Sequence, residues 1–289
     1  MNAEEEGRVA AGQFRREHRL GTQPLGDLVA LIEQVTGFDV AVLDVGPDEH
    51  GLTMRDPKGG AVFIGVARTR KPMRQRSTLA HELGHVRFED WIDSQAGDWA
   101  ARRFEEIRAD AFARHLLVPK EGLLDFLGDR GALSVADLSA VVQRFVVSPS
   151  IAAIALHDAG YIDVALKREW MNLSTPQLAF RFGWIDHYRA LQADSQHSRA
   201  PQRLLTRAIT AYAEGVLSVQ AVANLRGIPA EDAKAELDEA GMTPAERPIA
   251  WSAADDLPDV DVDLSSLDEL LNALDPDGDP ANGTAKDDG

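Results

Sequence analysis

The chain has 289 residues, a formal net charge of −17 and no cysteine. The lack of cysteine excludes disulfide bonds and any zinc site with cysteine ligands. No apolar run reaches membrane-spanning length and the acidic start of the chain is unlike a signal peptide, so we expect a cytoplasmic protein.

The first third of the chain predicts a small sheet that follows a helix. Residues 25–35 have the apolar spacing of an amphipathic helix, and residues 38–45 alternate apolar and polar side chains, as a half-buried strand does. Residues 52–55 and 61–67 predict a hairpin, because a segment rich in glycine lies between them. With the helices that come next, this order predicts an α+β fold in which a small antiparallel sheet packs on helices.

Residues 76–88 predict a helix that carries the motif H-E-x-x-H. His81 and His85 are four residues apart, so they share one helix face and both imidazoles can reach one ion. A zinc hydrolase needs three protein ligands and one position for water. Glu82 is turned by about 100 degrees from His81, which places it beside that water as a general base.

A second predicted helix supplies carboxylates at a matching spacing. Its apolar stripe runs from Phe104 and Ile107 to Leu117, and Glu106 and Asp110 share another face. Glu106 fits a third metal ligand. Asp110 fits a partner for a ligating histidine, where it accepts an N–H and orients the ring.

The alternative interpretation of both motifs is that their residues lie on the protein surface and bind no metal. A bare H-E-x-x-H arises by chance in about one chain of this length in a hundred. In that case both histidines are ordinary surface residues, and Glu106 and Asp110 are solvated like their charged neighbours. Glu105 is a rival for the third ligand, although it points about 100 degrees away from the face that Asp110 shares. The two motifs together favour the metal site.

With both motifs in view, the chain resembles the ImmA/IrrE family of zinc metallopeptidases, which is of the gluzincin type. The resemblance covers roughly residues 25–165. The segments that carry it are residues 76–85, 106–113, 116–119 and 147–150. Asp110 departs from the family, because asparagine is common at that position.

The resemblance implies one zinc ion per chain held by His81, His85 and Glu106, with Glu82 as the catalytic base. It leaves open whether zinc or manganese is used in the cell. Family members typically cleave a helix-turn-helix repressor and so switch on stress, phage or mobile-element genes. In gluzincins an edge strand near the metal holds the substrate backbone, and we expect residues 61–67 to be that strand; a plain core strand is the alternative.

His115 follows Asp110 on the second predicted helix and is a candidate to stabilise the oxyanion of the tetrahedral intermediate. A structural role is the alternative for this histidine. His157 and Tyr161 have the same two interpretations, with less support from the pattern.

We expect three regions along the chain. Residues 1–165 form the metallopeptidase domain, with its core at about 25–165, and residues 166–245 form a helical, helix-turn-helix-like domain. Residues 246–289 form an acidic tail that we expect to be disordered, since residues 251–289 hold 12 acidic residues against one lysine.

Three functions compete on this pattern. A site-specific zinc endopeptidase is favoured, because Glu82 has no purpose in a purely structural site. A zinc-containing module that regulates a partner transcription factor by contact alone is the second. The third is a DNA-binding regulator built on residues 205–242, but its last predicted helix, residues 230–239, has five acidic residues against one lysine. Phosphates would repel that helix, so we expect a protein partner rather than nucleic acid.

Overall fold

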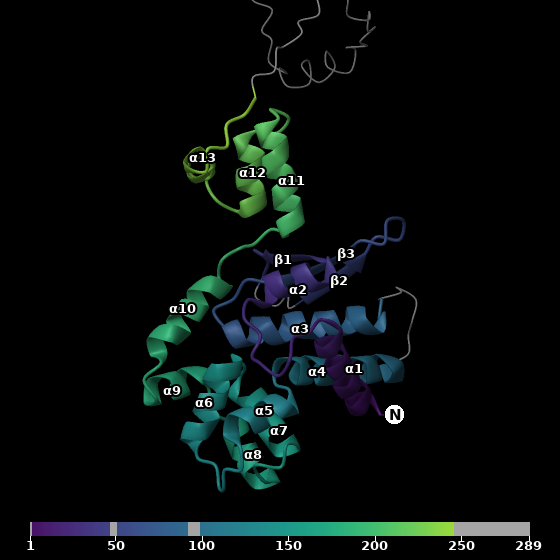
Figure 1. Ribbon diagram of the computed structural model, residues 1–289, viewed down its shortest axis with the longest axis vertical. Helices are drawn as coiled ribbons and strands as arrows, with labels where there is room; N and C mark the ends of the chain where they lie inside the picture. The colour runs from purple at the N-terminus through teal and green to yellow at the C-terminus, as the bar shows by residue number, and fades with distance from the viewer. Residues whose placement is uncertain (1, 47–50, 92–98, 246–289) are drawn as a thin grey trace, which may run out of the picture. The chain divides into compact units, whose positions relative to one another are not determined.

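The computed structural model describes residues 2–46, 51–91 and 99–245, with no side chains for 99–102 (Figure 1). The predicted acidic tail, residues 246–289, lies outside this range. The elements are α1 (Ala3–Glu17), α2 (Leu28–Thr36), β1 (Asp39–Leu43), β2 (Gly51–Arg55), β3 (Val62–Ala67), α3 (Pro72–Phe88), α4 (Trp99–Leu117), α5 (Lys120–Leu127), α6 (Val135–Phe145), α7 (Pro149–Asp158), α8 (Val164–Met171), α9 (Thr175–Arg181), α10 (Ile185–Ser195), α11 (Gln202–Ala213), α12 (Val219–Arg226) and α13 (Ala230–Glu239).

The predicted α+β class is confirmed, and the sheet is mixed rather than wholly antiparallel. Its strand order is β1-β3-β2. The predicted hairpin is present, since β2 pairs antiparallel with β3, whereas β1 pairs parallel with β3. A parallel pair needs a crossover connection, and here the chain from β1 to β3 passes through β2 at the far edge.

The strand expected to hold the substrate is at the centre of the sheet. β3 is paired on both sides, so it has no free edge in the described residues, and the expectation for residues 61–67 is wrong. The outer edge of β1 is also covered, because Val42 and Arg199 exchange two backbone hydrogen bonds of 2.9 and 3.0 Å. Among the described residues, only β2 has an outer edge that forms no backbone pairing with another segment.

The helix α3 lies between the sheet and α4 (Figure 1). Leu79, Leu83 and Val86 are buried at helical spacing, and Phe112 and Leu116 of α4 belong to the same core. Gly84 allows this close packing, because a Cβ there would lie 3.2 Å from Ala109 Cα. The two predicted motif helices therefore pack directly against each other.

The main core extends further along the chain than the predicted domain boundary at residue 165. That boundary falls inside α8, and Trp170, Leu178 and Tyr188 of α8–α10 are buried in the main core. A separate small core begins with α11; its buried residues are Ala208, Tyr212, Val222 and Leu237. The change of core thus lies between α10 and α11.

No single helix in the described residues is long and apolar enough to cross a membrane. The bent pair α6 and α7 reaches the required length and apolarity only when the two are joined. Leu138 of α6 and Leu156 of α7 are fully buried, as expected for helices that build a protein core.

Candidate metal centre

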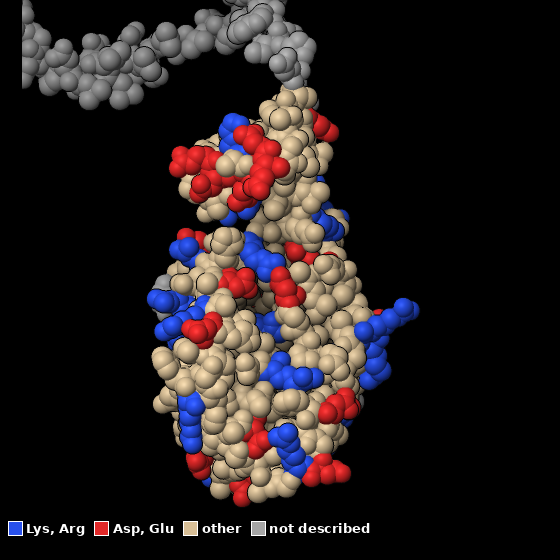
Figure 2. Space-filling model, turned by 60° about the vertical axis from the view of Figure 1, so that its left-hand side comes forward, with Lys and Arg blue, Asp and Glu red and all other residues tan. Residues whose placement is uncertain are grey.

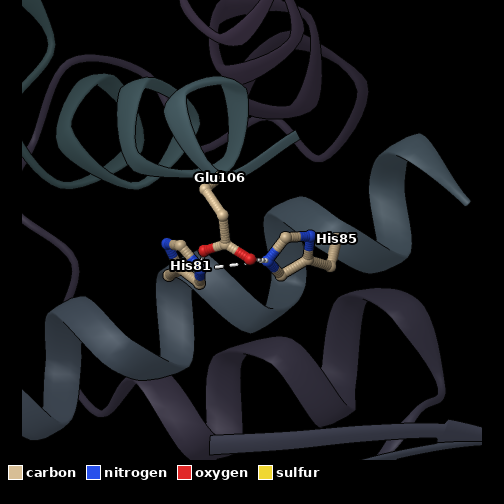
Figure 3. A group of neighbouring side chains, drawn as sticks. All are labelled: His81, His85 and Glu106. Carbon is tan, nitrogen blue, oxygen red and sulfur yellow. Dashed lines mark hydrogen bonds and ion pairs between the residues drawn. The ribbon is translucent and has the colours of Figure 1, made fainter. Parts of the chain in front are cut away.

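Three potential metal ligands converge from α3 and α4. The Nε2 atoms of His81 and His85 lie 3.0 Å apart, one helical turn from each other on α3. Glu106 reaches across from α4, with Oε2 3.2 Å from His81 Nε2 and Oε1 3.7 Å from His85 Nε2. Figure 3 shows the carboxylate between the two imidazoles. The structure therefore brings together the three residues that the sequence analysis selected.

These separations fit a tetrahedral zinc site. Zinc–nitrogen bonds of about 2.0–2.1 Å at tetrahedral angles place two ligand atoms roughly 3.3 Å apart. The three observed distances lie on either side of that value. Among the residues with described side chains, the donor set around this point is His81, His85 and Glu106, which leaves a fourth tetrahedral position for water or substrate.

A carboxylate orients the first histidine. His81 Nδ1 and Asp110 Oδ1 are 2.8 Å apart, so the carboxylate accepts the Nδ1–H and leaves Nε2 free to face the ion. Burial by itself lowers the pKa of His81, but the hydrogen bond to Asp110 and the charges of Asp110, Glu106 and Glu82 together raise that pKa above its ordinary value. The structure thus places Asp110 beside His81, as the sequence predicted.

A second carboxylate, which the sequence analysis missed, lies beside the other histidine. Asp90 Oδ2 is 3.3 Å from His85 Nδ1, and its other oxygen pairs with Arg108. Glu89 caps α3 in the left-handed region with a φ of 56°, and this turn brings Asp90 back toward His85. The guanidinium of Arg108 also lies 4.1 Å from the ring centroid of Phe88. The only sequence signal was an aspartate just beyond the helix end.

The predicted base Glu82 faces strand β2. Its Oε2 accepts a 2.6 Å hydrogen bond from Thr53 Oγ1. A Cβ at Gly51 would overlap Glu82 Oε1, so the absence of a side chain at Gly51 gives the carboxylate its room. Glu82 therefore lies between the helix that carries both histidines and the open edge of the sheet.

The structure does not bring His115 into this group. His115 is nine residues after Glu106, which is half a turn around the helix axis. Its Nε2 lies 3.3 Å from Glu4 Oε1 of α1. Tyr161 donates to the carbonyl of Gly128. Neither side chain has a contact with the metal ligands, so their expected role at the oxyanion has no geometric support.

The start of the apolar stripe predicted for α4 is not buried. Phe104 is 37% exposed and Ile107 is 41% exposed, whereas Leu117 is buried as expected. Ile107 follows Glu106 directly in the chain. The solvent-accessible apolar surface on this part of α4 therefore adjoins a proposed metal ligand.

One comparison with known proteins bears on this centre. Residues 36–157 match the model of a peptidase family described as the IrrE N-terminal-like domain. No curated protein matches the chain significantly. The matched residues run from the end of α2 to α7 and contain every residue of the metal centre, whereas α1 and the helices from α8 onward lie outside the match.

Proposed function

Because residues 36–157 belong to the IrrE N-terminal-like family of metallopeptidases, we propose that this chain is a zinc-dependent endopeptidase. The observation that carries the proposal is the convergence of His81, His85 and Glu106 next to the carboxylate of Glu82. When bound, zinc would supply a Lewis acid for the scissile carbonyl and would acidify the attacking water. One ion per chain is proposed, with the three converging side chains as its ligands.

The protein residues have separate tasks in the proposed reaction. Glu82 takes a proton from the attacking water and returns it to the leaving amine. Asp110 and Asp90 each accept an N–H from a ligating imidazole, which holds the two Nε2 atoms toward the ion. Thr53 holds the Glu82 carboxylate through its hydroxyl.

The open edge of β2 is the proposed binding place for the substrate backbone. Asp56 N–H donates to Ala61 O at the closed end of the hairpin. Backbone bonding alternates along an antiparallel pair, so Leu52 and Met54 direct their N–H groups to β3, and Thr53 and Arg55 direct theirs outward. An extended peptide that adds to this edge would pass beside Glu82.

The substrate that the family resemblance suggests is a helix-turn-helix repressor, whose cleavage would release stress, phage or mobile-element genes. Addition to β2 requires an extended chain, because a helix has no backbone groups free to pair with a strand. The cut is therefore proposed to fall in a loop or linker of the repressor rather than in its helices.

Co-expression with the helix-turn-helix protein encoded nearest to this chain tests the proposal. The wild type is expected to produce a discrete fragment of the partner, and Glu82→Gln is expected to produce none while keeping its zinc. Glu105→Gln, a nearby acid that is not among the three converging ligands, serves as the matched control and should cleave normally. The same fragment from Glu82→Gln would refute the proposed mechanism.

The same experiment addresses the alternative of a non-proteolytic zinc module. Such a module would change the partner's activity without cutting it. In that case the Glu82→Gln variant would change the partner's activity to the same extent as the wild type. Among the residues with described side chains only three potential ligands converge, and the fourth position that this leaves argues against a purely structural zinc.

A further inference from the structure

A large cavity lies away from the metal centre, against the N-terminal helix. It has a volume of about 1350 Å³, and its walls come from α1, from the junction of α4 with α5, and from α7 and α8. Small-molecule sites commonly measure about 300–1000 Å³, so this cavity has room for a metabolite and some water. The wall formed by α1 lies outside the residues that match the peptidase family.

The cavity is strongly basic although the chain as a whole is acidic. Seven lysine and arginine side chains line it against three aspartate and glutamate side chains. The full chain carries a net charge of −17. A local excess of four positive charges inside a concave, partly apolar wall concentrates anions there.

Two of the three acids are already paired within the cavity. Arg114 contacts the carboxylate of Glu4 and lies 3.8 Å from that of Asp158. His115 lies beside Glu4 as well. Glu4, His115 and Asp158 could in principle hold a cation, but the guanidinium of Arg114 already supplies positive charge to both carboxylates. This corner of the cavity is therefore closed to a metal ion.

Four of the lining cations have no acidic partner. Arg16, Arg19, Lys120 and Lys167 make no hydrogen bond or ion pair with any other described residue through their side chains. They come from both sides of the cavity, because Arg16 belongs to α1 and Lys167 belongs to α8. Cations that share one space and have no acidic partner of their own repel one another, and a bound anion would relieve that repulsion.

A buried arginine near the C-terminal end of α1 is the fifth of the lining cations that have no acidic partner. Arg15 is 4% exposed, and it donates to the carbonyls of Leu116, Gly21 and Gln23. Its Nη2 has no hydrogen-bond partner. Burial lowers the pKa of Arg15 to about 10, and the charge of Glu121 acts in the opposite direction, so the side chain stays protonated at neutral pH. This cation has only neutral hydrogen-bond acceptors.

Aliphatic side chains complete the lining. Val9, Val118, Ile154 and Met171 face the same cavity, and Met171 is 38% exposed. No phenylalanine, tyrosine or tryptophan side chain lines the cavity. A phosphate monoester suits the cations, because it carries close to two negative charges and three strong acceptor oxygens. We propose that this cavity binds a small organic phosphate with an aliphatic body.

Such a ligand would join the N-terminal helix to the catalytic domain. Its phosphate would contact cations from α1 and α8, and its body would lie on residues at the end of α4, the helix that also carries Glu106. A ligand that binds only the folded chain raises the melting temperature in proportion to the logarithm of its concentration.

Thermal unfolding of the full zinc-loaded chain with hexyl phosphate tests the proposal. The melting temperature is expected to rise once the concentration of hexyl phosphate exceeds its Kd, and then with the logarithm of that concentration. Inorganic phosphate should act more weakly because it lacks the body, and hexanol should have no effect because it lacks the charge. Lys167→Gln is expected to weaken the affinity roughly tenfold, the usual loss for a charge-assisted hydrogen bond.

The matched control is Arg168→Gln, which changes the next residue of α8. Arg168 is exposed and does not line the cavity, so this variant should bind as the wild type does. If hexyl phosphate instead bound to the zinc ion, Lys167→Gln would leave its affinity unchanged. The proposal is overturned if hexyl phosphate does not raise the melting temperature, if inorganic phosphate raises it equally well, or if both variants lose affinity alike.

Discussion

At the scale of single residues, the centre depends on contacts between segments that are distant in the chain. The shared face of His81 and His85 on α3 follows from helix periodicity, which the sequence alone predicts, and Glu106 and Asp110 share a face of α4 for the same reason. The contact from Thr53 to Glu82 spans 29 residues and depends on how β2 packs against α3. No local pattern contains that information, which is why Thr53 was not predicted. Asp90 is only five residues from His85, but its approach depends on the left-handed turn at Glu89.

The hydrogen bond from Thr53 predicts a measurable effect on turnover. Thr53→Val keeps the shape of the side chain but removes the donor, so the Glu82 carboxylate is held less well. We expect kcat to fall by about tenfold with little change in KM, since a charge-assisted hydrogen bond is lost. Steady-state kinetics on the cleaved partner would measure this.

Thr53→Ser is the matched variant, because it restores the hydroxyl without the methyl group. Its kcat should return close to the wild-type value, and the zinc content of both variants should equal that of the wild type. Equal kcat for Thr53→Val and the wild type would show that the contact does not position the base.

The candidate role of His115 could have been rejected from the sequence. Nine residues separate it from Glu106, and on a straight helix this interval places the two side chains on opposite faces. Its surroundings in the structure, Glu4 and Arg114, are consistent with that geometry. Burial, followed by the charge of Arg114, lowers the pKa of His115, so a neutral imidazole is favoured there.

At the scale of elements, strand order decides where a substrate can bind. The hairpin of β2 and β3 was predictable from its glycine-rich turn, but the parallel pairing of β1 with β3 was not. An alternating pattern identifies a strand and its buried face without specifying its neighbours. The sequence therefore assigned the substrate edge to β3, and the structure leaves that edge to β2.

Amide hydrogen exchange can locate the substrate on this edge. We expect a peptide that spans the cleavage site, bound to the Glu82→Gln variant, to protect the amides of Thr53 and Arg55. Leu52 and Met54 should change less, because their amides already face β3. Protection confined to β1, or no protection of β2, would contradict the proposed edge.

At the scale of the whole described chain, acidic side chains are unevenly distributed over the surface. Acidic side chains gather on the unit that contains α13, as Figure 2 shows. Lys234 pairs with Asp238, and Arg226 pairs with Glu236, so both cations are neutralised within the unit. A surface of this kind repels phosphate, which favours a protein partner for α11–α13 over nucleic acid.

The helical character of residues 166–245 was predictable, but the point at which the small core begins was not. The helices α8–α10 have the same apolar spacing as those that follow. Only contacts in three dimensions show that Trp170 and Tyr188 are buried in the main core, whereas Tyr212 is buried in the small one. Domain boundaries depend on which core a helix joins, and helical periodicity carries no information about that.

Zinc content tests whether His81, His85 and Glu106 together hold a metal ion. The wild type and Glu82→Gln are expected to purify with one zinc ion per chain, because Glu82 is not a proposed ligand. Glu106→Ala should lose the ion, and Glu105→Ala should keep it, because Glu106 alone of the two faces the histidines. Elemental analysis of the four proteins decides the matter: a Glu106→Ala variant that keeps its zinc, or a wild type that binds none, would rule out the proposed ligand set.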